Sequence, residues 1–211
     1  MRNKKILAYG FLLFGTAAVL LACALFLHNR LEDRKASRQA QIILEKLHTE
    51  LDNTSAVNES ITAQPGESDL YIPDYMLNPN MDMPAIEIDG DRYIGYLQFP
   101  TLSLELPIMR SWSYPDLKVA PCLYAGSIYT GNAVIAAHNY TSHFGPLYNL
   151  KPGDPVRFTD VDGNVFSYEV VTQEVLEATA IEDMTSSSFA LSLFTCTYGG
   201  ASRYTVRCEA L

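Results

Sequence analysis

An apolar run of 22 residues at positions 6–27 constrains this chain more than any other feature of its sequence. About 20 consecutive apolar residues are enough for a helix to cross the hydrocarbon core of a bilayer. Arg2, Lys4 and Lys5 precede the run, and the first 27 residues contain no acidic side chain. We therefore predict a cytoplasmic tail at residues 1–5 and a single membrane-spanning anchor at residues 6–27, which tethers the rest of the chain to the cell membrane.

Two alternatives to an uncleaved anchor remain open. A signal peptide would be removed, although its apolar region is usually shorter than this one. Residues 20–23 (Leu-Leu-Ala-Cys) resemble the cleavage box of a lipoprotein, in which Cys23 would carry the lipid. Residues 24–27 continue the apolar run where a lipoprotein usually turns polar, which favours the anchor. Basic residues both precede and follow the run, so charge alone does not orient it.

The rest of the chain is strongly acidic. Beyond Asp52 it holds 7 Lys and Arg residues against 19 Asp and Glu residues, a net charge of −12 over 159 residues. Such a surface repels phosphate backbones, which argues against nucleic-acid binding. The few cations become informative, because Arg203 and Arg207 closely follow Cys196.

The four cysteines are Cys23, Cys122, Cys196 and Cys208, and they form neither a Cys-x-x-Cys pair nor a Cys/His cluster with zinc spacing. The acidic residues show no pattern that would assign a calcium site. We therefore expect no metal site and no cofactor. One hypothesis is that Cys122 and Cys208 form a disulfide and leave Cys196 free.

Between the anchor and the last part of the chain, the pattern predicts a stalk and a linker. We predict a juxtamembrane stalk helix at residues 28–52, because apolar residues recur there at helical spacing. These residues are Ala40, Ile43, Leu44, Leu47 and Leu51. Residues 53–70 are polar and rich in turn-forming residues, so we predict that residues 53–84 are a flexible linker and a lead-in. The remaining residues, 85–211, form one predicted folded domain.

Short β-prone runs separated by turn signals fill that last segment. Hairpin signals occur at Asp89-Gly90-Asp91, at residues 161–164 and around Gly199-Gly200. The eight predicted strands are residues 86–88, 92–99, 104–109, 133–138, 155–160, 165–171, 189–196 and 202–211. This number of short strands predicts an all-β fold, an eight-stranded barrel with short helices.

Three side chains together indicate acyl-transfer chemistry. Cys196 ends one predicted strand, and His138 ends another that is strongly apolar. Arg203 follows Cys196 across a Gly-Gly turn, so a hairpin would return its guanidinium to the sulfur. A thiolate can attack an amide carbonyl, an imidazole can protonate the departing amine, and a fixed cation can stabilise the oxyanion. Geometry alone leaves His143 and Arg207 as competitors.

The motifs that carry these residues resemble the sortase family. Leu193-Phe194-Thr195-Cys196 followed by Arg203 resembles the family's TLxTC strand and the Arg of its next strand, with Ser192 where Thr is typical. Ala136-Ala137-His138 is similar to its His segment. The opening strands and the segment after His138 also match, so the resemblance covers residues 92–208. The matching stretches are Tyr93 to Leu97, Phe99-Pro100, Leu106-Pro107-Ile108, Phe144 to Leu147 and Leu150 to Asp154.

The resemblance implies a sortase-type barrel with its active site outside the cell. It implies a cysteine transpeptidase that cuts an LPxTG-like sorting signal near a Thr-Gly bond and passes the acyl group from Cys196 to an amine. Its partners would be secreted proteins with a C-terminal sorting signal, and the acceptor would be the amine of a peptidoglycan precursor or a pilin. It assigns the catalytic roles to His138, Cys196 and Arg203, and we assign Ser192 and Thr195 to substrate binding.

Sub-class and alternative functions complete the expectations. The short interval between His138 and Cys196 leaves little room for the helical insertion of class B. The lack of an apolar segment after Arg207 and of an Asp-Pro-aromatic lid argues against class C. We expect residues 171–188 to shape the groove that reads the signal. The alternatives are a thiol hydrolase, a non-catalytic surface binding module and a lipoprotein.

Overall fold

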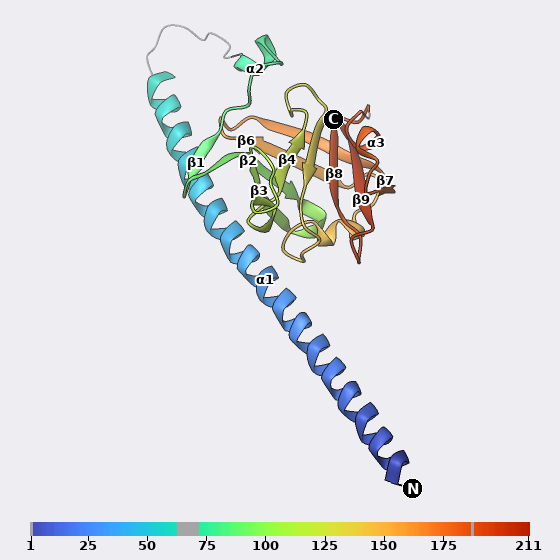
Figure 1. The fold of residues 1–211 in the computed structure, drawn as a ribbon. Coiled ribbons are helices and arrows are strands. Elements are labelled where there is room, and N and C mark those ends of the chain that lie inside the picture. Colours follow the sequence, from blue (N-terminus) through green and yellow to red (C-terminus); the bar gives the residue numbers. More distant parts are fainter. Residues whose placement is uncertain (1, 63–71, 187) are drawn as a thin grey trace. The chain divides into compact units, whose positions relative to one another are not determined.

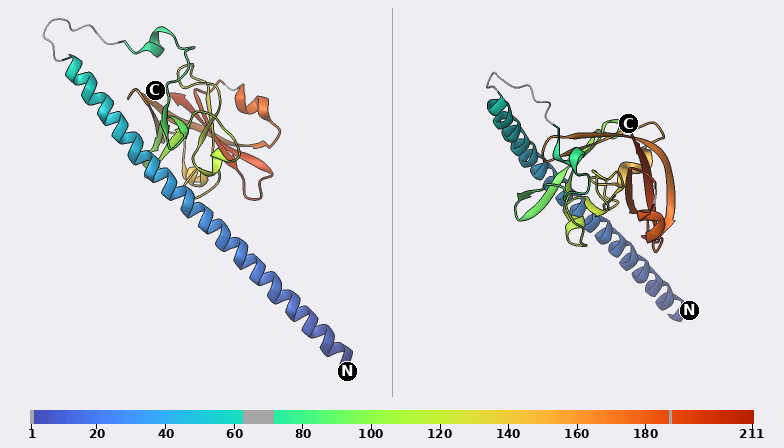
Figure 2. Two further views of the ribbon diagram at one scale, coloured as in Figure 1. Left: turned by 60° about the vertical axis from the view of Figure 1, so that its left-hand side comes forward. Right: turned by 90° about the horizontal axis from the view of Figure 1, so that it is seen from above.

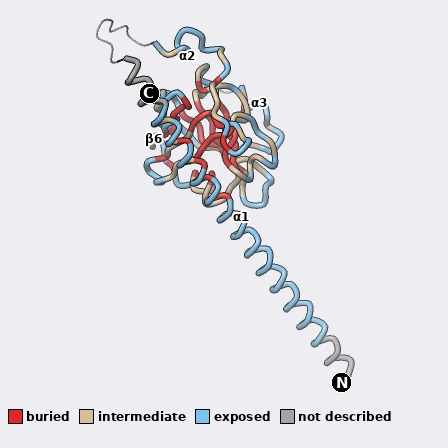
Figure 3. Tube along the Cα trace, turned by 90° about the vertical axis from the view of Figure 1, so that its left-hand side faces the viewer, coloured by how far each residue is buried: buried red, intermediate tan, exposed pale blue. Residues whose placement is uncertain are grey.

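The computed structural model describes residues 2–62, 72–186 and 188–211. The chain divides into two compact units, Met1–Lys35 and Ala36–Leu211, and helix α1 (Arg2–Thr62) runs from the first into the second. Within the first unit the large apolar side chains of α1 are exposed, Phe11, Leu13 and Phe14 among them, and the tube in Figure 3 is pale blue there. Among the described residues, α1 is the one helix long and apolar enough to cross a membrane.

Helix α1 extends past the predicted end of the stalk at Asp52 and continues to Thr62. The first part of the predicted flexible linker is therefore helical. The physical reason is that neither Pro nor Gly occurs between Gly15 and Pro65, so no helix-breaking residue interrupts this stretch. Residues 63–71 of that linker lie outside the described residues, and the lead-in contains the short helix α2 (Asp74–Leu77).

Nine strands and several short helices make up the rest of the second unit. The strands are β1 (Ile86–Ile88), β2 (Asp91–Phe99), β3 (Leu104–Met109), β4 (Cys122–Ala125), β5 (Ala133–Ala136), β6 (Pro155–Asp160), β7 (Val165–Glu177), β8 (Leu191–Cys196) and β9 (Ser202–Ala210). The short helices are α3 (Ile181–Thr185) and three 3-10 turns, η1 (Pro100–Leu102), η2 (Asp116–Lys118) and η3 (Gly145–Asn149).

The strands close into a barrel, as predicted. Their hydrogen-bonded order is β1-β2-β3-β4-β5-β8-β9-β7-β6, and β6 also pairs with β2. Strands β2 to β9 therefore form the closed eight-stranded ring, while β1 pairs with the beginning of β2. Figures 1 and 2 show these strands curving around a common interior.

The sequence-derived set of strands differs from this ring by one member. It includes β1, which lies outside the ring, and omits β4, which belongs to it. Strand β4 has only four residues, follows a proline and contains Cys and Ala, so it lacks the alternation and β-branched content that reveal a strand.

Barrel closure requires a glycine at position 95. The backbone of Gly95 has φ +144°, and a Cβ atom there would collide with the carbonyl oxygen of Thr159 on β6. Glycine is the residue that tolerates both this conformation and such a close approach of two strands.

Two apolar clusters stabilise the second unit. The larger fills the barrel, where Leu97, Ile135 and Leu193 are fully buried. In Figure 3 the buried residues, drawn red, gather in the interior of the barrel. The smaller lies between α1 and the outside of the barrel and includes Ile43 and Leu47 of the helix.

Polar contacts accompany the smaller cluster. Lys46 forms an ion pair with Asp89 at 2.6 Å, and His48 Nε2 lies 2.6 Å from a carboxylate oxygen of Glu105. The helix segment that follows Ala36 is therefore packed against the barrel as part of the domain.

The proposed disulfide between Cys122 and Cys208 is wrong. Both are buried free thiols, Cys122 in the cluster beneath α1 and Cys208 in the barrel interior. Their strands, β4 and β9, are separated by β5 and β8, which at about 4.8 Å per strand is beyond the reach of a disulfide. Burial raises the pKa of each of these thiols to about 12.

Candidate active site

Parallel pairing of β5 and β8 brings His138 and Cys196 to the same edge of the sheet. Ala136 pairs with Phe194, and His138 and Cys196 each lie two positions further along their own segments. Because side chains alternate between faces, a step of two keeps both on the face of Ala136 and Phe194. The amide of Ala137 donates to the carbonyl of Phe194 at 3.1 Å, so the pairing continues one residue past the end of β5.

Antiparallel pairing of β8 and β9 places Arg203 directly opposite Cys196. Adjacent residues across such a ladder have Cβ atoms about 5 Å apart and share one face. The guanidinium of Arg203 donates from Nη1 to the carbonyl oxygens of Gly200 (3.1 Å) and Ser202 (3.2 Å), which holds it at the turn after β8. Thus the structure brings together the three residues that the sequence predicted.

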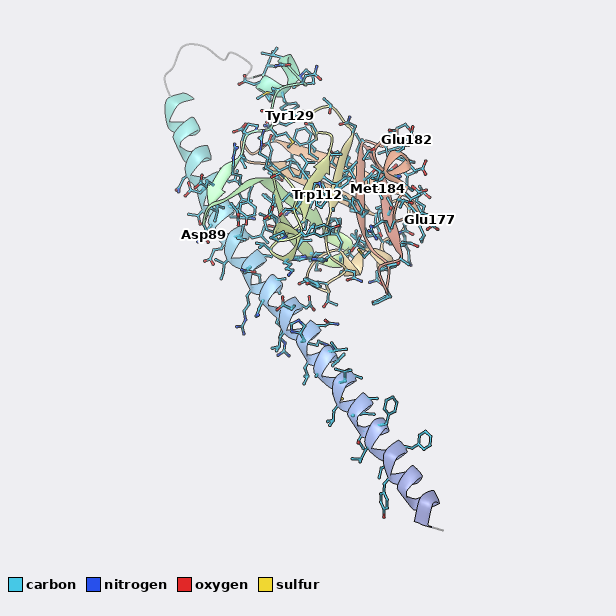
Figure 4. All side chains as sticks on the ribbon, viewed as in Figure 1. Asp89, Trp112, Tyr129, Glu177, Glu182 and Met184 are labelled. Atoms are coloured by element: carbon cyan, nitrogen blue, oxygen red, sulfur yellow. The ribbon has the colours of Figure 1, made fainter. Side chains whose placement is uncertain are left out.

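A pocket of about 390 Å³ receives all three side chains. Its walls are mostly apolar and come from the β3–β4 connection, from β4 and β5, and from the segment that joins β7 to β8. Besides the three, the principal lining residues are Trp112, Tyr124, Ala136, Glu177, Ile181, Met184 and Phe194. Figure 4 labels Trp112, Glu177 and Met184 among them.

Aromatic contacts shape one wall of the pocket. Phe194 meets Tyr124 edge to face with ring centroids 5.3 Å apart, and Tyr124 contacts Trp112 at 5.2 Å. Ala136, which pairs with Phe194 on the neighbouring strand, adds a small apolar side chain to the same lining. The resulting surface suits an apolar peptide side chain.

His138 is held in a desolvated position. Its Nε2 atom is buried and has no hydrogen-bond partner among the described residues, and its ring stacks on Tyr140 with centroids 4.8 Å apart. Burial lowers the pKa of His138, and the positive charge of Lys118 lowers that pKa further. The neutral imidazole is therefore favoured, and the imidazolium is a stronger acid than usual.

The structure separates the competing candidates. His143 is fully buried and does not line the pocket. Arg207 is 2% exposed and also lies outside the pocket lining, with its guanidinium bonded to neighbouring segments. Of these four candidates, His138 and Arg203 line the pocket together with Cys196.

Ser192 and Thr195 do not reach the pocket. Ser192 is buried and its Oγ accepts a hydrogen bond of 2.7 Å from Arg207. Thr195 is buried on the opposite face of β8, where its Oγ1 has no partner among the described residues. We therefore do not retain the assignment of Ser192 and Thr195 to substrate binding. Ser192 is bonded to Arg207, and Thr195 faces the interior of the domain.

The sequence did not identify the aromatic wall. Trp112 and Tyr124 flank an irregular connection, and no periodic pattern linked them to Cys196. The chain's single Trp and the dense aromatic content of that connection were the available signals. Five lining residues do come from the segment expected to shape the groove: Glu177, Ala178, Ala180, Ile181 and Met184.

This arrangement can perform acyl transfer through a thioester. A sulfur, an imidazole and a guanidinium line one pocket, and a guanidinium can stabilise the charge that develops on a carbonyl oxygen. Within the described residues, no group of three or more His, Cys, Asp or Glu side chains could hold a metal ion.

Comparison with known proteins identifies the family of this fold. Residues 97–211 match the family model of the sortase domain. Among solved structures, sortase C1 from Streptococcus agalactiae aligns with a TM-score of 0.52 and 20% identity, over 78% of this chain and 89% of that one.

Two further structures from Clostridium perfringens are similar. Its sortase C, solved with the C-terminal cell wall sorting motif, gives a TM-score of 0.51 and 24% identity over 79% of this chain and 90% of that one. Its sortase D5 transpeptidase gives 0.50 and 19% over 56% and 79%. At these identities the likeness is one of fold. A search of curated proteins by sequence found no match.

Proposed function

Because the chain belongs to the sortase family of cysteine transpeptidases, we propose that it cleaves an LPxTG-like sorting signal and joins the acyl product to a cell-wall amine through a thioester on Cys196. The observation that carries this proposal is the meeting of three adjacent segments at one pocket. His138 follows β5, Cys196 ends β8 and Arg203 lies opposite it on β9.

The first half-reaction forms the acyl-enzyme. His138 takes the proton of the Cys196 thiol, and the sulfur attacks the carbonyl carbon of the scissile Thr-Gly bond. Arg203 stabilises the resulting oxyanion, since its guanidinium stays protonated. When the C–N bond breaks, the His138 imidazolium gives its proton to the departing amine, and the lowered pKa of His138 favours this transfer.

The second half-reaction releases the product. An acceptor amine attacks the thioester carbonyl, the new amide bond forms and the C–S bond breaks. His138 accepts the proton lost by the amine and returns it to the sulfur. Atoms and charges balance over the cycle, and no cofactor is required.

The mostly apolar walls of the pocket support a peptide ligand of the sorting-signal kind. Trp112, Tyr124 and Phe194 form one wall, while Ile181 and Met184 form another. A branched apolar side chain would lose water on both sides between these walls. The fold likeness to sortase C and D structures does not assign the sub-class, so the expectation against classes B and C stays a prediction.

The N-terminal helix supports a place for the enzyme at the cell surface. We propose that residues 6–27 span the membrane once, that residues 1–5 are cytoplasmic and that the catalytic domain is extracellular. In intact cells, a membrane-impermeant maleimide should then label Cys196. Labelling that requires cell lysis would contradict this orientation.

The decisive experiment is a transpeptidation assay on the full-length chain in detergent. A library of LPxTG-like peptides is incubated with the protein and an amine acceptor, and mass spectrometry searches for a thioacyl adduct on Cys196. We expect an adduct that an added amine converts to the new amide, and no adduct with Cys196→Ala. Absence of any adduct across the library would refute the proposal, and hydrolysis unaffected by amines would indicate a thiol hydrolase.

A further inference from the structure

Helix α3 forms a wall of the pocket although it has only five residues. Ala180, just before it, and Ile181 and Met184 within it line the pocket that holds Cys196. A helix this short is not stable by itself in water, because nucleation costs more than one turn of hydrogen bonds returns. Contacts with the barrel must therefore set its position.

Arg207 supplies two hydrogen bonds that hold α3 against the barrel. Its Nη2 donates to the carbonyl oxygen of Asp183 at 2.7 Å, and its Nη1 donates to that of Met184 at 3.1 Å. These carbonyls belong to the last turn of α3, where backbone acceptors lack partners within the helix. A cation at a helix C-terminus also interacts favourably with the helix dipole.

The other side of the guanidinium is fixed to the sheet. Nε donates to Glu174 on β7 at 2.7 Å, and Nη1 donates to Ser192 on β8 at 2.7 Å. The ring of Phe189 lies 5.7 Å from the guanidinium carbon. Because Arg207 lies on β9, one side chain connects three strands of the barrel to α3.

Burial makes this connection hard to replace. Arg207 is 2% exposed, whereas its ionic partner Glu174 is 40% exposed. A fully buried cation is costly unless its donors are satisfied, and only a planar fork of several donors reaches acceptors in these directions at once. Lysine, with one nitrogen, cannot hold both carbonyls and both side-chain acceptors.

We propose that Arg207 is a positioning residue that fixes α3 and thereby sets the width of the pocket that holds Cys196. It does not touch the reacting atoms. It acts through Ile181 and Met184, whose side chains form the apolar wall, so it determines how well an apolar residue of the donor peptide is selected. This inference rests on the proposed function, since the donor peptide is the ligand that the wall would read.

The test compares Arg207→Met, Arg207→Lys and Glu174→Ala with the exposed control Arg157→Met on β6. The full-length protein in detergent is assayed with two donor peptides that differ by Leu or Ala at the apolar position. We expect Arg207→Met to raise KM for the Leu peptide by about tenfold, with a much smaller change in kcat, and to reduce the preference for Leu over Ala. Glu174→Ala, which removes a partly exposed partner, should act in the same direction and remain folded if Arg207→Met does not.

Hydrogen exchange provides a readout that does not depend on turnover. The amide of Met184 donates to the carbonyl of Ala180, just before α3, and the amide of Ser186 donates to that of Glu182 within the helix. Both amides should exchange faster in the Arg207 variants than in Arg157→Met. Unchanged exchange would show that Arg207 does not hold α3. Faster exchange with an unchanged KM and an unchanged preference for Leu over Ala would show that Arg207 does not act on the donor peptide. If the wild-type protein turns over no peptide, the proposed function fails, while the exchange data still decide whether Arg207 holds α3.

Discussion

Replacing Leu47 by Ala should show that the helix after Ala36 is part of the catalytic domain. Leu47 is fully buried in the cluster that includes Tyr93, Met109 and Cys122 of the barrel. Removing a fully buried Leu side chain leaves a cavity as well as losing apolar burial, and typically costs about 3 kcal/mol of unfolding free energy. For a domain of this size, 1 kcal/mol shifts the melting temperature by about 2–4 °C, so a fall of about 6–12 °C is expected.

The matched control for this prediction is Ile42→Ala. Ile42 lies on the same helix but is 51% exposed, so its loss should change the free energy of unfolding by less than about 0.5 kcal/mol. Differential scanning calorimetry of the three full-length proteins in one detergent measures the difference. Equal melting temperatures for the two variants would refute the argument, because the helix would then contribute no buried surface to the domain.

Three further predictions concern the site and the barrel. The acid limb of the kcat/KM pH profile should lie below the usual pKa of histidine near 6.5, since burial and the charge of Lys118 both lower the pKa of His138. Lys118→Gln removes this positive charge, so it should raise the pKa of His138 and move the limb to higher pH. A limb that does not move would contradict the assignment of the limb to His138. Tyr140→Ala should lower kcat about tenfold while Tyr140→Phe keeps the stacked ring and most activity, so equal losses would argue against a stacking role. Gly95→Ala should lower the free energy of unfolding by more than ~3 kcal/mol, because it adds a backbone collision to an unfavourable φ. Gly163→Ala, which has open space around it, should lower it by only ~1–2 kcal/mol. Chemical denaturation of both variants measures the difference.

Local signals in the sequence predicted the barrel well. The turn at Asp89-Gly90 joins β1 to β2, and the turn at Gly199-Gly200 joins β8 to β9, as their residue types indicated. Both depend on backbone conformations with positive φ that glycine tolerates, so the information lies within a few residues. The His138 and Cys196 segments were visible for the same reason, because each ends a short apolar run.

The features that the sequence could not provide depend on neighbours across the sheet. Ser192 was predicted to bind substrate, but Arg207, fifteen positions later, covers it through a hydrogen bond. Whether Cys122 and Cys208 meet is decided by the strands that lie between them, and strand order is not a local property. The stalk helix continues past Asp52 despite the polar composition of residues 53–62, because no Pro or Gly interrupts them.

Because two of its thiols are inaccessible, the second unit has one reactive sulfur that can be titrated. Cys122 and Cys208 are buried, and with each pKa raised to about 12 neither forms a thiolate at neutral pH. Cys196 is the partly exposed thiol of the second unit, so a mild alkylating reagent modifies one sulfur per catalytic domain. Stoichiometric labelling therefore measures the concentration of competent enzyme in a preparation. Under oxidising conditions, the burial of Cys122 and Cys208 also keeps both thiols from forming a crosslink with Cys196.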